Sequence, residues 1–322
     1  MAVFTHSVVA QNEAVTAGTV VSYDLPVSPM SFVVLTLKFL QNLANTQILI
    51  ANIMAALSKV ETLYKGQAIN SMSGLDLGAL NAHILGFVPW AVNYMGDNDN
   101  VLSYSWIVPF GRTPYSPNEA FPATKRGELV LQITYPAAFT NIDAVHCQVE
   151  SVELPEASPS QFVKATTLVG TPAATGQFDV SLPIGNVISD LLLWGTTIPA
   201  AGVTTRTITD LQVRKGNKEI FFSKANFESL HAIQGLFANM PVQFGSHIHQ
   251  IDGAAFAQYM DTSAVKGANH MFPNHLHVPF DVLGDGSYAL ETANATSLCV
   301  RVTAGDTNAL RVIPVEIVKV GT

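Results

Sequence analysis

The tripeptide Val-Pro-Phe occurs twice in this chain of 322 residues, at positions 108–110 and 278–280, each time within a segment that has the composition of a β-strand. The segments around it recur in the same order in both halves of the chain. The matching pairs are residues 23–27 and 180–184, 63–66 and 213–216, 107–112 and 277–282, 129–134 and 298–303, and 145–154 and 311–320. Because proline and glycine recur along with the apolar residues, a tandem duplication explains the pattern better than the general likeness of β-strands does.

The repeated unit is predicted to be mostly β-strand. Residues 129–134 and 298–303 alternate apolar and other side chains with a period of two, which is typical of a strand with one buried face. Residues 215–217, Lys-Gly-Asn, are expected to form a hairpin turn. Proline has no backbone N–H, so each Val-Pro-Phe is expected at a strand end, an edge or a bulge.

One short helix is expected in each half. Ser73 is placed to cap a helix that runs through Phe87, with Asp76 in a position close to that of a capping box. Ser223 is expected to cap a second helix that runs through Phe237, because apolar residues follow it at helical spacing. The segment 46–57 fits a helix and a strand equally well, and both alternatives stay open.

These elements predict an all-β protein of two tandem eight-stranded jelly-roll barrels, each with a short helix. The first jelly roll is expected over residues 1–155 and the second over residues 178–322. Residues 156–177 are expected to be the linker, since they are rich in Pro, Ala, Thr, Ser and Gly and show little periodicity.

The composition indicates a protein with much of its surface against other subunits. The chain is 48% hydrophobic but only 12% charged, where soluble chains average about 25% charged residues. Interface cores are depleted in charge in the same way. The net charge is −8 and the first twenty residues contain no Lys or Arg, so neither a basic arm for nucleic acid nor a signal peptide is expected. The apolar segment 31–57 is interrupted by polar residues and is not expected to span a membrane.

Two His-x-His pairs, His247 with His249 and His275 with His277, are the strongest metal-site candidates. Such a pair in a strand places both rings on one face, and a pair in each of two barrels would resemble a bicupin. Here both pairs lie in the second half, and the Glu that follows the cupin pair is missing. They are therefore interpreted as polar or interface histidines. The acidic segment 96–100 lacks the rest of a calcium loop and is interpreted as a turn.

No other catalytic signature is present. The sequence has no Gly-x-Ser-x-Gly, P-loop or Gly-x-Gly-x-x-Gly motif, and residues 125–128 are its only notable basic cluster. No catalytic, cofactor-binding or metal-binding residues are therefore assigned. Cys147 and Cys299 are interpreted as buried free thiols, with a disulfide between them left open.

Interface positions are hypothesised from aromatic and proline-rich content. Trp106, Trp194 and the loops 88–100 and 112–127 are candidates for positions near interfaces. The alternative for the two tryptophans is a place in the core.

Residues 179–194, DVSLPIGNVISDLLLW, and residues 209–230, TDLQVRKGNKEIFFSKANFESL, with their matches in the first half, resemble the double jelly-roll major capsid proteins of tailless icosahedral bacteriophages that have an internal membrane. The resemblance implies a structural virion protein without enzymatic activity or cofactor. It further implies homotrimers that act as pseudo-hexagonal capsomers, with neighbouring trimers and penton or cement proteins as partners and no direct nucleic-acid binding.

Assembly is then expected in the host cytoplasm, and the final location in the virion capsid. Contact with the internal membrane is left open, because residues 1–20 are neutral and only weakly apolar. The alternative function is a two-barrel enzyme or sugar-binding protein, of the bicupin type or acting on glycans.

Overall fold

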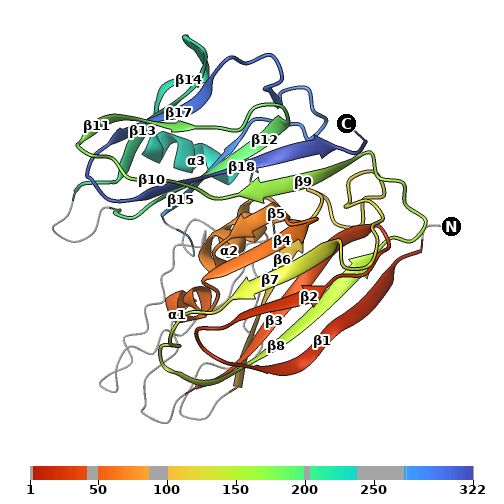
Figure 1. Cartoon of the computed structure of the whole chain (residues 1–322). Coiled ribbons are helices and arrows are strands. Elements are labelled where there is room, and N and C mark those ends of the chain that lie inside the picture. The colour runs from red at the N-terminus through yellow and green to blue at the C-terminus, as the bar shows by residue number, and fades with distance from the viewer. Residues whose placement is uncertain are drawn as a thin grey trace.

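The structure is a computed structural model that describes residues 3–41, 50–86, 101–198, 204–237, 272 and 274–321. Figure 1 shows two β-rich halves lying side by side. The elements of the first half are β1 (Thr5–Val15), β2 (Val20–Asp24), β3 (Met30–Gln41), α1 (Ile50–Ala55), β4 (Lys59–Tyr64), β5 (Gln67–Met72), α2 (Gly74–His83), β6 (Val101–Pro109), β7 (Leu129–Thr134) and β8 (Ile142–Glu153). Those of the second half are β9 (Gln161–Thr166), β10 (Leu168–Gly170), β11 (Gly176–Ser181), β12 (Val187–Gly195), β13 (Ile208–Lys215), β14 (Lys218–Asn226), α3 (Phe227–Phe237), β15 (His275–Pro279), β16 (Leu290–Glu291), β17 (Leu298–Ala304) and β18 (Leu310–Lys319).

Each half contributes two antiparallel sets of four strands with the same strand order, and one set from each half is joined to the other in a single ten-stranded sheet that also includes β10 and β16. The first half has the orders β1-β8-β3-β6 and β5-β4-β7-β2. The second half has the corresponding orders β9-β18-β12-β15 and β14-β13-β17-β11. This confirms the prediction of two tandem eight-stranded jelly rolls, each with a short helix between its corresponding strands, α2 and α3. Within the described residues, the two sheets of each half are not hydrogen-bonded to each other into a closed barrel.

The hydrogen bonds next to Val-Pro-Phe confirm the internal repeat. Both prolines end their strands, β6 and β15, as expected for a residue without an N–H. The next residue, Phe110, donates its N–H to the carbonyl of Ser31 at 3.0 Å, and Phe280 donates to the carbonyl of Ser189 at 2.9 Å. Both phenylalanine side chains are buried. The same backbone contact therefore occurs at the same place in both jelly rolls.

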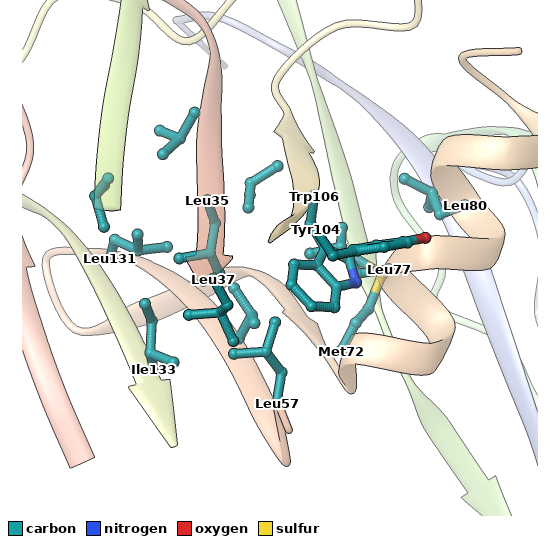
Figure 2. Close-up of a cluster of buried hydrophobic side chains, with 14 of the residues drawn as sticks. Leu35, Leu37, Leu57, Met72, Leu77, Leu80, Tyr104, Trp106, Leu131 and Ile133 are labelled. Carbon is teal, nitrogen blue, oxygen red and sulfur yellow. The ribbon is translucent and has the colours of Figure 1, made fainter. Parts of the chain in front are cut away.

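The core of the first jelly roll lies between its two sheets and helix α2. Figure 2 shows Leu35 and Leu37 of β3 facing Leu131 and Ile133 of β7. Trp106 is fully buried in this cluster, and its indole N–H donates to the carbonyl of Gly74 at 2.9 Å. Trp106 is therefore a core residue, and the hypothesis that it lies near an interface is wrong, because the alternation along β6 turns it inward.

Both hairpins that the sequence match predicts are present, and each has a two-residue turn. The second turn begins one residue later than the match predicts. Lys65 and Gly66 both have positive φ, at 49° and 79°, and form a two-residue turn between β4 and β5. In the second half Lys215 pairs with Lys218, and Gly216 occupies the first turn position at φ 62°. Glycine is suited to this conformation because it has no Cβ.

The predicted cap of the second helix is wrong. Ser73 does cap α2, accepting a hydrogen bond from the N–H of Asp76 at 3.2 Å. The cap of α3, however, is Asn226, whose side chain accepts from the N–H groups of Glu228 at 2.9 Å and Ser229 at 3.3 Å. Ser223 lies earlier, within β14.

Extra residues in β14 explain this shift. The four residues 221–224 lie between the strand partners of Val213 and Leu211. At the corresponding place in β5, the single residue Ser71 lies between the partners of Thr62 and Val60. β14 therefore has three more residues than β5 at this place, and the cap of α3 lies three residues later than the sequence match predicts.

The two jelly rolls are joined through a shared sheet. Strand β5 of the first pairs in parallel with β9, at Asn70 with Ala165 and at Ser71 with Thr166. β9 lies within the expected linker, residues 156–177, which also contains β10 and the start of β11. Because β9 occupies the same place beside β18 as β1 does beside β8, we propose that the second jelly roll begins near Gln161.

The cap assignment predicts different effects for two polar-to-alanine substitutions. Asn226→Ala should lower the free energy of unfolding by about 1 kcal/mol, because two N–H groups at the start of α3 lose their acceptor. Ser223→Ala, at an exposed site in the same segment, should change it by less than about 0.5 kcal/mol. Urea unfolding of both variants provides the measurement, and a larger loss for Ser223→Ala would contradict the assignment.

Candidate functional site at the junction of the two jelly rolls

Helix α2 of the first jelly roll lies against the sheet of the second that contains β15 and β18 (Figure 1). Asp76 of α2 accepts hydrogen bonds from Nε2 of His275 at 3.1 Å and from Nη2 of Arg311 at 2.9 Å. Its other carboxylate oxygen accepts from the hydroxyl of Thr167 at 3.4 Å. The side chains of Asp76 and His275 are each only 1% exposed. One buried carboxylate thus binds three segments of the second half.

The electrostatics of this cluster depend on its burial. Burial alone would raise the pKa of Asp76, but the hydrogen bond from His275 and the positive charge of Arg311 together lower it. Burial also lowers the pKa of His275, and the neighbouring Asp76 offsets this only in part. His275 is therefore neutral at pH 7 and donates through Nε2, while Asp76 carries a charge that Arg311 balances.

A second histidine of β15 faces the same helix. The ring of His277 lies 5.8 Å from that of His83 in α2, centroid to centroid. Its Nε2 lies 2.8 Å from a carboxylate oxygen of Asp190 in β12. The prediction that His275 and His277 present their rings on one face is confirmed, and that face is turned toward α2.

Arg112 forms another bridge between the jelly rolls. Its Nη1 donates to Asp281 at 2.6 Å and its Nε to Glu119 at 2.9 Å. Burial would lower the pKa of Arg112, but the two carboxylates raise it above its usual value. The loop 112–127 also meets β9, because the N–H of Ala120 donates to the carbonyl of Gln161 at 3.1 Å. This hypothesised interface loop therefore lies at the junction within one chain.

Apolar packing surrounds the polar contacts. Leu192 of β12 and Ile313 of β18 belong to the core cluster of the first jelly roll, although their strands belong to the second. Phe272 is 1% exposed and lies so near α2 that a Cβ added to Gly78 would come within 3.1 Å of its ring. Trp194 is partly buried, with the Arg311 guanidinium 3.6 Å from its ring centroid. The junction is thus packed like a domain interior.

Several predicted positions lie outside the described residues, namely His247, His249, the segment 96–100 and the loop 88–100. Among the residues that are described, no group of three or more His, Cys, Asp and Glu side chains is placed to hold a metal ion. In the same part of the chain, no helix has the length and apolar character needed to cross a membrane.

Both cysteines are free thiols, as predicted, but only Cys147 is buried as expected, and Cys299 is partly exposed. Burial raises the pKa of both thiols, which makes them poor nucleophiles at pH 7.

Sequence reasoning missed most of the residues that make the junction. Asp76 was noted only as a neighbour of the helix cap, and Arg112, Asp281 and Arg311 were not singled out. One signal was available: Asp76 is the only charged residue of an otherwise largely apolar helix. A carboxylate in such a helix needs a buried partner.

Comparison with known proteins gives matches in structure alone. No protein-family model matches the chain, and no curated protein matches it in sequence. The fold is similar to that of the major capsid protein of Sulfolobus turreted icosahedral virus, with a TM-score of 0.70, 14% identity, and 98% of this chain and 97% of that chain covered. It is also similar to major capsid protein P2 of bacteriophage PM2, with a TM-score of 0.62, 11% identity, and 99% and 98% covered. PBCV-1 Vp54 matches with a TM-score of 0.61, 11% identity, and 98% and 94% covered.

The fold class follows from these matches and from the strand order. The chain is a double jelly-roll protein, with the fold of viral major capsid proteins over its whole length. This confirms the predicted fold class and the structural side of the resemblance.

The buried carboxylate at the junction should be required for stability. Asp76→Ala should lower the free energy of unfolding by about 3–5 kcal/mol, because it leaves the partly buried Arg311 guanidinium and the buried His275 ring without their partner. Asp179→Ala is the matched control, since it breaks the exposed ion pair with Arg301 and should cost less than about 1 kcal/mol. Chemical denaturation measures both, and similar losses would contradict the role assigned to Asp76.

The neutral state of His275 predicts a pH dependence. Its folded pKa lies below the usual 6.5, so the unfolded chain binds more protons than the folded one below that pH, and stability falls as the pH drops through 6.5 toward the folded pKa. Wild type should lose stability between pH 7.5 and about 5.5, and His275→Gln should lose less over that window. Denaturation midpoints at several pH values give the comparison. Parallel curves for the two proteins would show that His275 does not contribute.

Proposed function

We propose that this protein is the major capsid protein of an icosahedral virus and acts by assembly rather than by catalysis. The observation that carries the proposal is the full-length match to viral major capsid proteins, with at least 94% of each of the three chains compared above covered. Both jelly rolls and the way they are joined are included in that match.

The proposed working unit is a homotrimer that acts as a pseudo-hexagonal capsomer. Each chain supplies two jelly rolls of the same strand order, so three chains supply six similar units around a ring. The low charge, 12% of residues, is consistent with extensive burial between subunits. The buried, hydrogen-bonded junction supports this role, because a capsomer needs its two jelly rolls in one fixed relation.

The proposed location is the virion capsid, after assembly in the host cytoplasm. The proposed partners are neighbouring trimers and capsid proteins of other kinds, such as penton or cement proteins. Direct contact with an internal membrane stays an open part of the proposal. Direct binding of the genome is not part of it, since the net charge is −8 and nucleic-acid binding needs clustered positive charge.

Among the residues that the structure describes, no observation favours the alternative of a two-barrel enzyme. His275 and His277, the described members of the predicted metal candidates, are hydrogen-bonded to two different carboxylates, Asp76 and Asp190. Their geometry fits structural roles at the junction. The chain also offers these pairs in one half only, whereas a bicupin site would be expected in each.

Solution mass tests the proposal. Light scattering of the purified protein should give three times the chain mass of 34.5 kDa, or larger closed particles visible by electron microscopy. Metal analysis of the same sample should find no stoichiometric ion. A stable monomer with one metal ion per chain would contradict the capsid proposal and would favour a metal site at the histidine pairs.

A further inference from the structure

The internal repeat assigns corresponding residues at the outer strands β1 and β9. Opposite the prolines of Val-Pro-Phe lie Phe32 in β3 and Asp190 in β12. On its other side, Phe32 pairs with Val152 of β8, and Asp190 pairs with Val315 of β18. One residue further along, Glu153 pairs with Thr5 and Glu316 pairs with Lys164.

Thr5 therefore corresponds to Lys164. The preceding residues then correspond in order, so that Val3 takes the place of Phe162 and Phe4 the place of Val163.

The second-half members of these pairs are buried against the first jelly roll. Phe162 is 9% and Val163 is 2% exposed. The N–H of Val163 donates to the carbonyl of Phe110 at 2.8 Å, and the Phe162 ring lies 4.9 Å from that of Phe121. These contacts are part of the junction within the chain.

The corresponding residues of the first half are far more exposed, although the Phe4 ring lies 5.3 Å from that of Tyr115. Val3 is 48% and Phe4 is 58% exposed, and Val8 further along β1 is also 58% exposed. Apolar side chains thus occupy positions in the first half whose counterparts in the second half form the junction. We name Val3, Phe4 and Val8 the donor patch.

The repeat also identifies the surface that corresponds to the receiving side of the junction. Phe280 corresponds to Phe110. Leu290 corresponds to Phe121, since Leu290 pairs with Ile188 as Phe121 pairs with Met30.

Apolar residues around this second surface are exposed. They are Phe221 at 50%, Val282 at 41%, Leu283 at 66% and Tyr288 at 52%. The Phe221 ring lies 4.6 Å from that of Phe280. We name these four residues the acceptor patch.

We propose that the donor patch of one copy of this chain docks on the acceptor patch of a second copy, repeating between chains the contact that joins the two jelly rolls within a chain. This rests on the proposed function, since it specifies the surfaces of the capsomer. β14, which carries Phe221, lies far from β1, which carries Val8 (Figure 1), so we assign the contact to two different chains. Two unlike patches make a head-to-tail contact, which closes into a ring when the rotation per chain allows it.

Two single substitutions test the two sides. Phe4→Asp introduces a charge into the donor patch, and Leu283→Asp introduces one into the acceptor patch. Both side chains are more than half exposed, so each variant should fold, as checked by circular dichroism and the thermal midpoint. Each variant alone should be a 34.5 kDa monomer by light scattering. Val169→Asp is the control, because Val169 is 68% exposed in β10, outside both patches, and this variant should keep the wild-type mass.

Mixing the two variants distinguishes a head-to-tail contact from a symmetric one. The Phe4→Asp chain keeps an intact acceptor patch and the Leu283→Asp chain keeps an intact donor patch. The mixture should therefore form pairs of one chain each, with twice the mass of 34.5 kDa, in a concentration series that leaves each variant alone monomeric. Rings should not form, because each pair retains only one intact contact.

The outcomes separate this inference from the function on which it rests. If wild type assembles and both variants keep its mass, or if the mixture stays monomeric, the assigned patches are wrong and the capsid proposal stands. A loss of assembly in Val169→Asp equal to that in the other variants would also overturn the assignment. If wild type itself is a monomer, the proposed function fails.

Discussion

Burial of the Asp76 carboxylate between the two jelly rolls is the interaction on which the rest of the arrangement depends. A charge placed 1% exposed in an apolar helix is costly unless it is paired. Its partners, His275 and Arg311, come from the second jelly roll, so the first half satisfies its own buried charge only when the second half is docked in one position. Replacing a buried ion pair by apolar residues is often neutral for stability, whereas removing one partner is costly. We therefore infer that the main effect of this contact is to define the relation between the two jelly rolls.

The docking changes the environment of one sheet, and the sequence reflects it. In β3 the buried positions alternate with partly exposed ones that include Thr36 and Lys38, because one face of the sheet is open. In the corresponding strand β12, residues 188–193 are all buried, since one face packs in the second core and the other against α2. Leu191, Leu192 and Leu193 form a continuous apolar run, as expected of a strand covered on both faces. The polar residues before them, Ser189 and Asp190, are hydrogen-bonded. The two copies of the repeat have therefore diverged where one is inside the chain and the other faces outward.

The same divergence points to assembly. Positions that are buried at the junction in one copy of the repeat stay apolar and exposed in the other, and exposed apolar clusters are typical of interaction surfaces. A duplicated domain that uses one edge internally retains an equivalent edge for a neighbour. In the proposed capsid role, the contact within a chain and the contact between chains use the same packing arrangement. Burial of both contacts is consistent with the low charge of the chain.

The sequence by itself determined the all-β class, the duplication, the strand periodicity, the hairpin at residues 215–217 and the cap at Ser73, because these depend on local geometry and on order along the chain. It did not determine the cap at Asn226, which depends on a bulge, or whether the apolar face of β6 that carries Trp106 packs in the core or against another subunit. Nor did it reveal that Asp76 meets Arg311, 235 positions away along the chain. Only the tertiary structure decided these, because contacts between distant segments follow from how sheets dock, and periodicity in the sequence reports which face of an element is buried but not what covers it.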